Sequence, residues 1–199
     1  MRKTIGWLCL GLLGASPLVG CKRAPACDVS SNDAVRALYH KLTNEELDTK
    51  HECIERSAVF PGLVRVGHFA YDRGCRDRNV IVNCQLDPPD VARQALASAG
   101  WAQADLAQRQ QLALSWLTEG EDDVVLRAQP SQWPTGKAFA PPQSSATDDG
   151  GLLLRYWRGT HHGKTRMTSF TSVEVRFQKD GSHSPAQEGE SVEVELRSN

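Results

Sequence analysis

The segment Phe170–Gln178, with the sequence FTSVEVRFQ, alternates from Val173 onward between apolar and charged side chains. In an extended chain the apolar residues from Val173 to Phe177 share one face, while Glu174 and Arg176 share the other, because successive side chains of a strand point to opposite faces. The pattern predicts a strand with one buried and one solvated face. Such strands are typical of an antiparallel sheet that is covered on one side.

Two other stretches extend this sheet along the chain. Leu152–Arg158 predicts a strand before it, and Val192, Val194 and Leu196 alternate with charged residues in a strand after it. We therefore expect a C-terminal antiparallel β-meander covered on one face by helices, which makes the fold α+β.

A central pair of helices is the expected cover. The sequence Asp87–Asp90 is a helix start, and a stripe of small apolar residues then runs to Gly100. A longer helix is predicted over Ala104–Thr118. Trp101 and Trp116 flank this pair, and we expect them to pack the helices onto a sheet.

Between the helix pair and the meander, Val124–Leu126 predicts a short strand and residues 128–151 form a loop rich in Pro, Gly and Ser. A loop of this length is either functional or a linker. Trp133 and Phe139 lie inside it. We expect these rings to hold the loop against the domain, because large apolar rings are normally buried; contact with a partner is the alternative.

N-terminal helices are predicted from two patterns. Residues Ser30–Leu42 carry apolar side chains at helical spacing. Thr43–Glu46 reads as a capping box, which predicts a second helix that carries Cys53 and Ile54.

A hairpin is expected next. Leu63–Tyr71 is rich in β-branched and aromatic residues, and Val80–Leu86 predicts a second strand. The charged segment Asp72–Arg78 between them is the expected turn, and it holds Cys75.

The N-terminus carries the pattern of an export signal. Arg2 and Lys3 precede an apolar stretch that ends in Leu18–Cys21, with the sequence LVGC. The stretch is too short and too broken by Gly for a membrane span of roughly 20 residues. LVGC resembles the lipobox of bacterial lipoproteins, in which the cysteine thiol is diacylated and the lipoprotein signal peptidase cuts just before it.

The resemblance implies residues 1–20 as a signal peptide and 21–30 as a short lipidated tether. The length of the remaining chain and its strand and helix patterns predict a single α+β domain over 31–199. Cys21 would then hold the protein at the membrane through its acyl chains, since two chains anchor a protein stably. Lys22 stands where an Asp would favour the inner membrane, so the resemblance implies an outer-membrane protein that faces the periplasm or the cell surface. The alternatives are a plain secreted protein and an apolar N-terminal helix.

Four cysteines remain after Cys9 leaves with the signal and Cys21 is lipidated. In an exported chain they predict two disulfides, with three possible pairings. Neighbours in sequence need the least loop closure, which favours Cys27–Cys53 and Cys75–Cys84. A zinc site is the alternative, but the spacings contain no short knuckle of the kind that zinc sites use.

The charge of the chain is nearly balanced. The net charge is −1, and loss of the two basic residues of the signal leaves −3. Nucleic-acid binding, which calls for a basic domain or stripe, is not supported.

Catalytic motifs are absent from the sequence: it contains no G-x-S-x-G elbow, no H-E-x-x-H and no phosphate-binding glycine loop. The weak metal candidates are His161 and His162, placed in the loop Gly159–Thr168. No carboxylate lies near them in sequence, and His68 joins them only if the fold brings it there. A solvated turn is favoured, and no cofactor is expected.

These patterns together predict a membrane-anchored lipoprotein that acts as a non-catalytic accessory or binding module of the cell envelope. Its expected partners are the membrane, through Cys21, and an envelope protein. The alternatives are a hydrolytic or metal-dependent envelope enzyme that uses His161 and His162, and a small-solute-binding protein.

Overall fold

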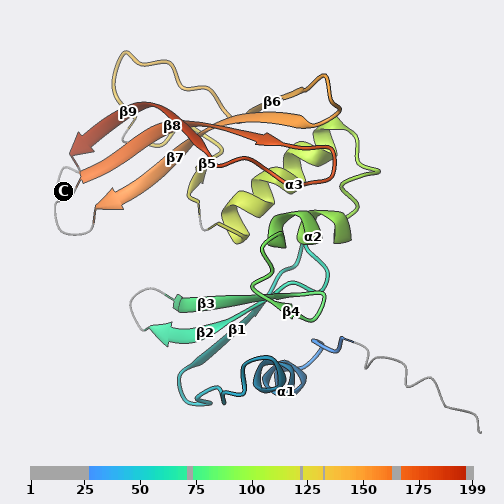
Figure 1. Ribbon diagram of the computed structural model, residues 1–199. Helices are drawn as coiled ribbons and strands as arrows, with labels where there is room; N and C mark the ends of the chain where they lie inside the picture. Colours follow the sequence, from blue (N-terminus) through green and yellow to red (C-terminus); the bar gives the residue numbers. More distant parts are fainter. Residues whose placement is uncertain (1–26, 71–73, 122, 132, 163–166, 196–199) are drawn as a thin grey trace, which may run out of the picture.

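The chain forms a mixed α+β structure, as the sequence predicts. A computed structural model describes residues 27–70, 74–121, 123–131, 133–162 and 167–195. Within these residues it has three helices and two antiparallel sheets. Figure 1 shows α1 (Asn32–Thr43) below the N-terminal sheet, and α2 (Val91–Ser98) and α3 (Leu106–Glu119) between that sheet and the C-terminal one.

The N-terminal sheet has the order β1-β2-β3-β4, each strand pairing antiparallel with the next. Val35 and Tyr39 of α1 pack against Val64, Val66 and Ile81 of the sheet, and all five side chains are buried. The predicted hairpin is present as β2 and β3, but two of its details are wrong. Strand β3 already begins at Gly74, so Cys75 lies in a strand and not in the turn, and Val80–Leu86 is divided between β3 and β4. The bounds are β1 (Glu52–Arg56), β2 (Val64–Ala70), β3 (Gly74–Val82) and β4 (Gln85–Leu86).

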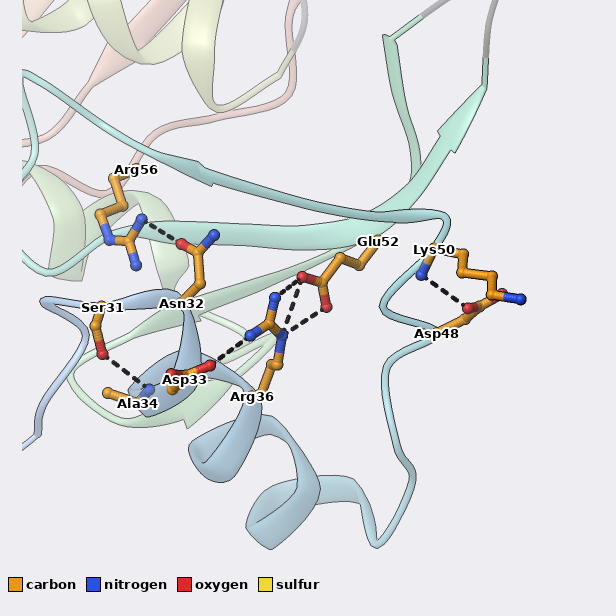
Figure 2. Close-up of polar contacts among 9 residues, drawn as sticks. All are labelled: Ser31, Asn32, Asp33, Ala34, Arg36, Asp48, Lys50, Glu52 and Arg56. Atoms are coloured by element: carbon orange, nitrogen blue, oxygen red, sulfur yellow. Dashed lines mark hydrogen bonds and ion pairs between the residues drawn. The ribbon is translucent and has the colours of Figure 1, made fainter.

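Polar contacts fix α1 on this sheet, as Figure 2 shows. Ser31 caps the helix by accepting a hydrogen bond from the backbone N–H of Ala34 at 3.1 Å. Arg36 Nε donates to Glu52 Oε2 at 2.9 Å, and its hydrogen bonds to Glu52 raise the pKa of Arg36 above its usual range. Arg56 reaches from β1 to Asn32 at 2.9 Å. The helix is therefore held to β1 at two separate points.

The second N-terminal helix is a wrong prediction, because Cys53 and Ile54 lie in β1. Thr43 is the last residue of α1 and not the cap of a new helix. Its hydroxyl donates to the Tyr39 carbonyl at 2.9 Å and accepts from the Glu45 N–H at 3.0 Å. The next residue, Asn44, is left-handed with a φ of 62° and ends the helix.

The predicted disulfide pairing is also wrong, because Cys27 pairs with Cys84. Cys84 and Asn83 form the two-residue turn between β3 and β4, and both have positive φ, as hairpin turns of this length require. The bridge joins the chain before α1 to the β3–β4 turn at the edge of the sheet. Cys53 is disulfide-bonded as well, and the side chain of Cys75 lies outside the described part of the chain.

The predicted C-terminal meander is confirmed in its described part, and it gains two short strands. Its order is β5-β7-β8-β9, with β6 pairing the same edge of β7 as β5. The prediction of a structureless loop over 128–151 is wrong for β6. Leu196 lies outside the described residues. The bounds are β5 (Val125–Leu126), β6 (Gln143–Ala146), β7 (Leu152–His162), β8 (Met167–Phe177) and β9 (Gln187–Glu195).

The helices α2 and α3 cover one face of this sheet, as expected, and build the larger core with it. Asp105 and Gln108 form a capping box that starts α3. Trp101 packs on Phe177 of β8, with ring centroids 5.6 Å apart, as predicted. Trp116 lies in the same core, where its ring also packs on Phe60 from the segment between β1 and β2, at 5.9 Å.

Residues 57–63 join the two sheets. They connect β1 to β2 in sequence, and they pack in the larger core that α2 and α3 form with the C-terminal sheet. Phe60 and Leu63 are buried in that core. The Ser57 hydroxyl donates to the Glu119 carboxylate at the end of α3 at 2.5 Å. The N-terminal sheet is thus held to the helix layer by both apolar and polar contacts.

Candidate binding groove

A groove crosses the outer face of the C-terminal sheet, the face opposite to the one that α2 and α3 cover. Its cavity volume is about 420 Å³, within the ~300–1,000 Å³ of small-molecule sites. Strands β7, β8 and β9 form the floor, and residues 140–143 form one wall. We call this site the outer groove; the residues that line it include Ala140, Gln143, Arg155, Trp157, Glu174 and Gln187.

Four polar side chains form a row across the groove. Gln143 of β6 pairs with Arg155 of β7, Arg155 with Glu174 of β8, and Glu174 with Gln187 of β9. Neighbouring strands lie about 4.7–4.9 Å apart, so this polar row places four planar groups side by side. Within it, Arg155 Nε donates to Glu174 Oε2 at 2.6 Å.

An aromatic cluster flanks the polar row. Trp133 packs against Trp157 of β7, Phe170 of β8 and Phe139 of its own loop, with ring centroids 4.8, 5.3 and 5.1 Å apart. Its indole N–H donates to the Lys137 carbonyl at 3.0 Å. The expectation that these loop rings pack on the domain is confirmed. The loop passes over the face of the sheet opposite to α3 (Figure 1).

Gly189 keeps the floor of the groove open at β9. A Cβ at this position would lie 2.6 Å from the Ser172 hydroxyl, so a side chain here could enter only if Ser172 moved. The pairing of β8 with β9 shifts register between Thr171 and Val173. This β-bulge at the edge strand lies beside the groove, a place where bulges are common in functional sheets.

A polar network supports the groove from the inner face. Glu188, which also lines the groove, forms an ion pair with Arg158. Arg158 lies 3.5 Å from the Asp123 carboxylate, which also accepts a hydrogen bond from the Tyr156 hydroxyl. Burial, with the Asp123 contact, raises the pKa of Tyr156 above its usual range, so this hydroxyl stays a donor.

His183 and Glu121 form a second ion pair under the sheet. His183 Nε2 lies 2.8 Å from Glu121 Oε1, and Nδ1 lies 3.0 Å from the Ser184 carbonyl. The Trp116 indole N–H lies 3.2 Å from Nε2 and 3.3 Å from Glu121 Oε1, and it can donate to the carboxylate. Each ring nitrogen then has an acceptor, which favours the doubly protonated ring. The hydrogen bond to Glu121 raises the pKa of His183, and the same bond lowers the pKa of Glu121.

The His183–Glu121 pair predicts a pH-dependent stability. A raised histidine pKa contributes stability that is complete below the ordinary value of 6.5 and is lost as pH rises through the folded value. The lowered pKa of Glu121 contributes stability above pH 4.5, and this contribution is lost only in stronger acid. We expect His183→Gln to lower the free energy of unfolding by about 1.5 kcal/mol near pH 6 and by clearly less near pH 9. Denaturant unfolding of variant and wild type at the two pH values measures the difference.

The matched control is His51→Gln, which removes a histidine–carboxylate pair to Asp48 in which both side chains are more than half exposed. Exposed pairs contribute little, so this variant should unfold like the wild type at both pH values. An equal cost of His183→Gln at pH 6 and pH 9 would contradict the assignment.

The metal candidates of the sequence are distributed over both sheets. His161 and His162 lie in β7, paired with Thr168 and Met167, and not in a loop as expected; their side chains lie outside the described part. His68 is in β2 of the other sheet. Among the described residues, no three His, Cys, Asp or Glu side chains come together as a metal site.

The residues of the groove were missed by sequence reasoning, although three of its strands, β7, β8 and β9, were predicted at least in part. Alternation places Glu174 on the outer face, but only the strand order and register bring it between Arg155 and Gln187. The sequence feature that could have indicated this site is the pair of aromatic residues Trp133 and Phe139 in an otherwise polar loop.

Comparison with models of known protein families, with curated proteins and with solved structures finds no match to this chain.

Proposed function

We propose that this protein is a lipid-anchored bacterial envelope protein that acts as a non-catalytic binding module, and that the outer groove is its binding site. The observation that carries the binding role is the groove itself: a hollow with an aromatic side and a polar row, built on paired strands. Sites on strands hold their side chains more rigidly than sites on loops.

The anchor rests on the LVGC motif, which ends at Cys21. No helix among the described residues is long and apolar enough to cross a membrane. Cys27 lies only six positions after Cys21, a reach of about 20 Å at most. Cys27 is bridged to the N-terminal sheet, so the anchor would hold that end of the molecule close to the lipid.

This geometry gives the groove a direction. The C-terminal sheet lies at the other end of the molecule from α1, with its outer face turned away from the helices (Figure 1). A molecule held at Cys27 would present the outer groove away from its own membrane. It would be open to envelope components in the periplasm or at the cell surface.

Cys21→Ser is expected to move the protein from the membrane fraction to the soluble fraction of the cell envelope, because the thiol that carries the lipid is gone. Cys9→Ser is the matched control. It removes a cysteine ahead of the cleavage site and should leave the protein in the membrane fraction. If Cys21→Ser stays in that fraction as fully as the control, the lipobox assignment is wrong.

The binding role is tested in cells with a photo-crosslinking amino acid at Gln187, in the groove, and at Gln111, which is exposed on α3. We expect one recurrent envelope component to be captured from Gln187 and not from Gln111. Identical products from the two positions would count against the groove as the binding site.

A further inference from the structure

We propose that the outer groove binds an uncharged glycan segment, with a sugar ring against Trp157 and its hydroxyls on the polar row. This proposal rests on the proposed function, because it names the ligand class of the same site.

The charged groups of the groove are paired with protein partners. Arg155 binds Glu174 at 2.6 Å within the groove, and Glu188 forms its ion pair with Arg158. An anionic ligand would have to compete with Glu174 for Arg155, and a cationic ligand would have to compete with the arginines for the two carboxylates. The groove therefore suits a ligand without net charge.

The polar row fits neighbouring hydroxyl groups. Gln143 and Gln187 end in amides, Arg155 in a guanidinium and Glu174 in a carboxylate. Each of these groups places two hydrogen-bonding atoms in one plane, and together they offer both donors and acceptors. A sugar ring presents adjacent hydroxyls, each of which donates and accepts, so it can bind without breaking the Arg155–Glu174 pair.

The apolar wall fits the other surface of a sugar. Trp157 is half-buried and is held by the ring of Trp133 at 4.8 Å, so its position is fixed before a ligand arrives. Ala140 and Pro141 also line the groove. The C–H face of a pyranose ring is apolar and packs on an aromatic ring, while its edge carries the hydroxyls toward the polar row.

The floor gives room for a chain of sugars. Gly189 has no side chain at the point where β9 borders the groove, next to Ser172. The volume of about 420 Å³ suits a short oligosaccharide segment. Since the groove is open at the surface of the sheet, a longer glycan could continue beyond it.

The test is a titration of the purified full chain in detergent, followed by tryptophan fluorescence and calorimetry. The probes are tri-N-acetylchitotriose for an amino-sugar glycan, cellotriose for a plain hexose glycan, trilysine and inorganic phosphate. We expect saturable binding of at least one glycan and weaker or no binding of the charged probes. Which of the two glycans binds more tightly distinguishes an amino-sugar source from a plain hexose source.

Variants assign the binding to the groove. Arg155→Ala combined with Gln187→Ala should weaken glycan binding by about tenfold or more, the effect of losing one or two hydrogen bonds. Gly189→Leu should weaken it by placing a side chain in the groove. Arg176→Ala is the matched control, because it removes an exposed arginine–carboxylate pair to Asp149 outside the groove; its binding should equal that of the wild type.

The proposal is overturned if neither glycan saturates up to about 10 mM, a concentration at which even weak sites fill. It is also overturned if trilysine or phosphate binds more tightly, or if the groove variants bind like the control. Should the glycans fail while Gln187 still crosslinks to one envelope protein in cells, the binding module stands and only the ligand class is wrong.

Discussion

Removal of the Cys27–Cys84 bridge by Cys27→Ser combined with Cys84→Ser is expected to lower the free energy of unfolding by about 4 kcal/mol. The two residues are 57 positions apart, and a bridge that closes a loop of this length restricts the unfolded chain by about that amount in the chain-entropy model. Urea unfolding of the double variant and the wild type at one pH measures the difference.

The turn at Cys84 provides a control within the same experiment. Cys84 has a φ of 61°, which costs an ordinary residue about 1 kcal/mol relative to glycine. Cys27→Ser combined with Cys84→Gly should therefore be more stable than the double serine variant by about that amount, while still lacking the bridge. A double serine variant as stable as the wild type would show that the bridge contributes nothing.

Trp133→Ala should have the second large effect, a loss of about 3 kcal/mol, which is usual for removing a buried tryptophan. Trp133 is 6% exposed and touches three other rings. Its indole also binds the carbonyl of Lys137, which belongs to the bond that trypsin cuts. We expect rapid tryptic cleavage after Lys137 in the variant and slow cleavage in the wild type.

Two control variants separate local release of the loop from general instability. Trp133→Phe keeps a ring in the cluster and loses only the indole N–H, so its cleavage rate should lie between the other two. Ile81→Ala destabilises the core of the N-terminal sheet without touching the loop, and under native conditions Lys137 should remain protected. Equal cleavage of Trp133→Ala and wild type would contradict the role of Trp133.

The parts of the fold that sequence predicted are those in which local pattern and tertiary packing agree. The alternation from Val173 to Phe177 describes β8 correctly, because its apolar side chains face the helices. The helical periodicity of Ala104–Thr118 locates α3, which begins with a capping box at Asp105. In both elements the side chains that set the pattern are also the ones that the core buries.

The parts that sequence missed depend on contacts between distant residues. β6 has no apolar alternation, and it is held by pairing with β7 and by the contacts of Gln110 with Pro142 and Ser144. The pairing of Cys27 with Cys84 follows from α1 lying across the sheet, which loop length alone does not reveal. The polar row of the groove likewise exists only through strand register.

The Cys27–Cys84 bridge also determines how tension would pass through the molecule. If the lipid at Cys21 holds one end and a bound glycan pulls on the other, the load enters at Cys27. The force then passes through the disulfide bond to the turn between β3 and β4, 57 positions further along the chain. The helix α1 and strands β1 to β3 lie within the covalent loop and carry none of it. A protein anchored in this way can be pulled from both ends without peeling α1 from its sheet.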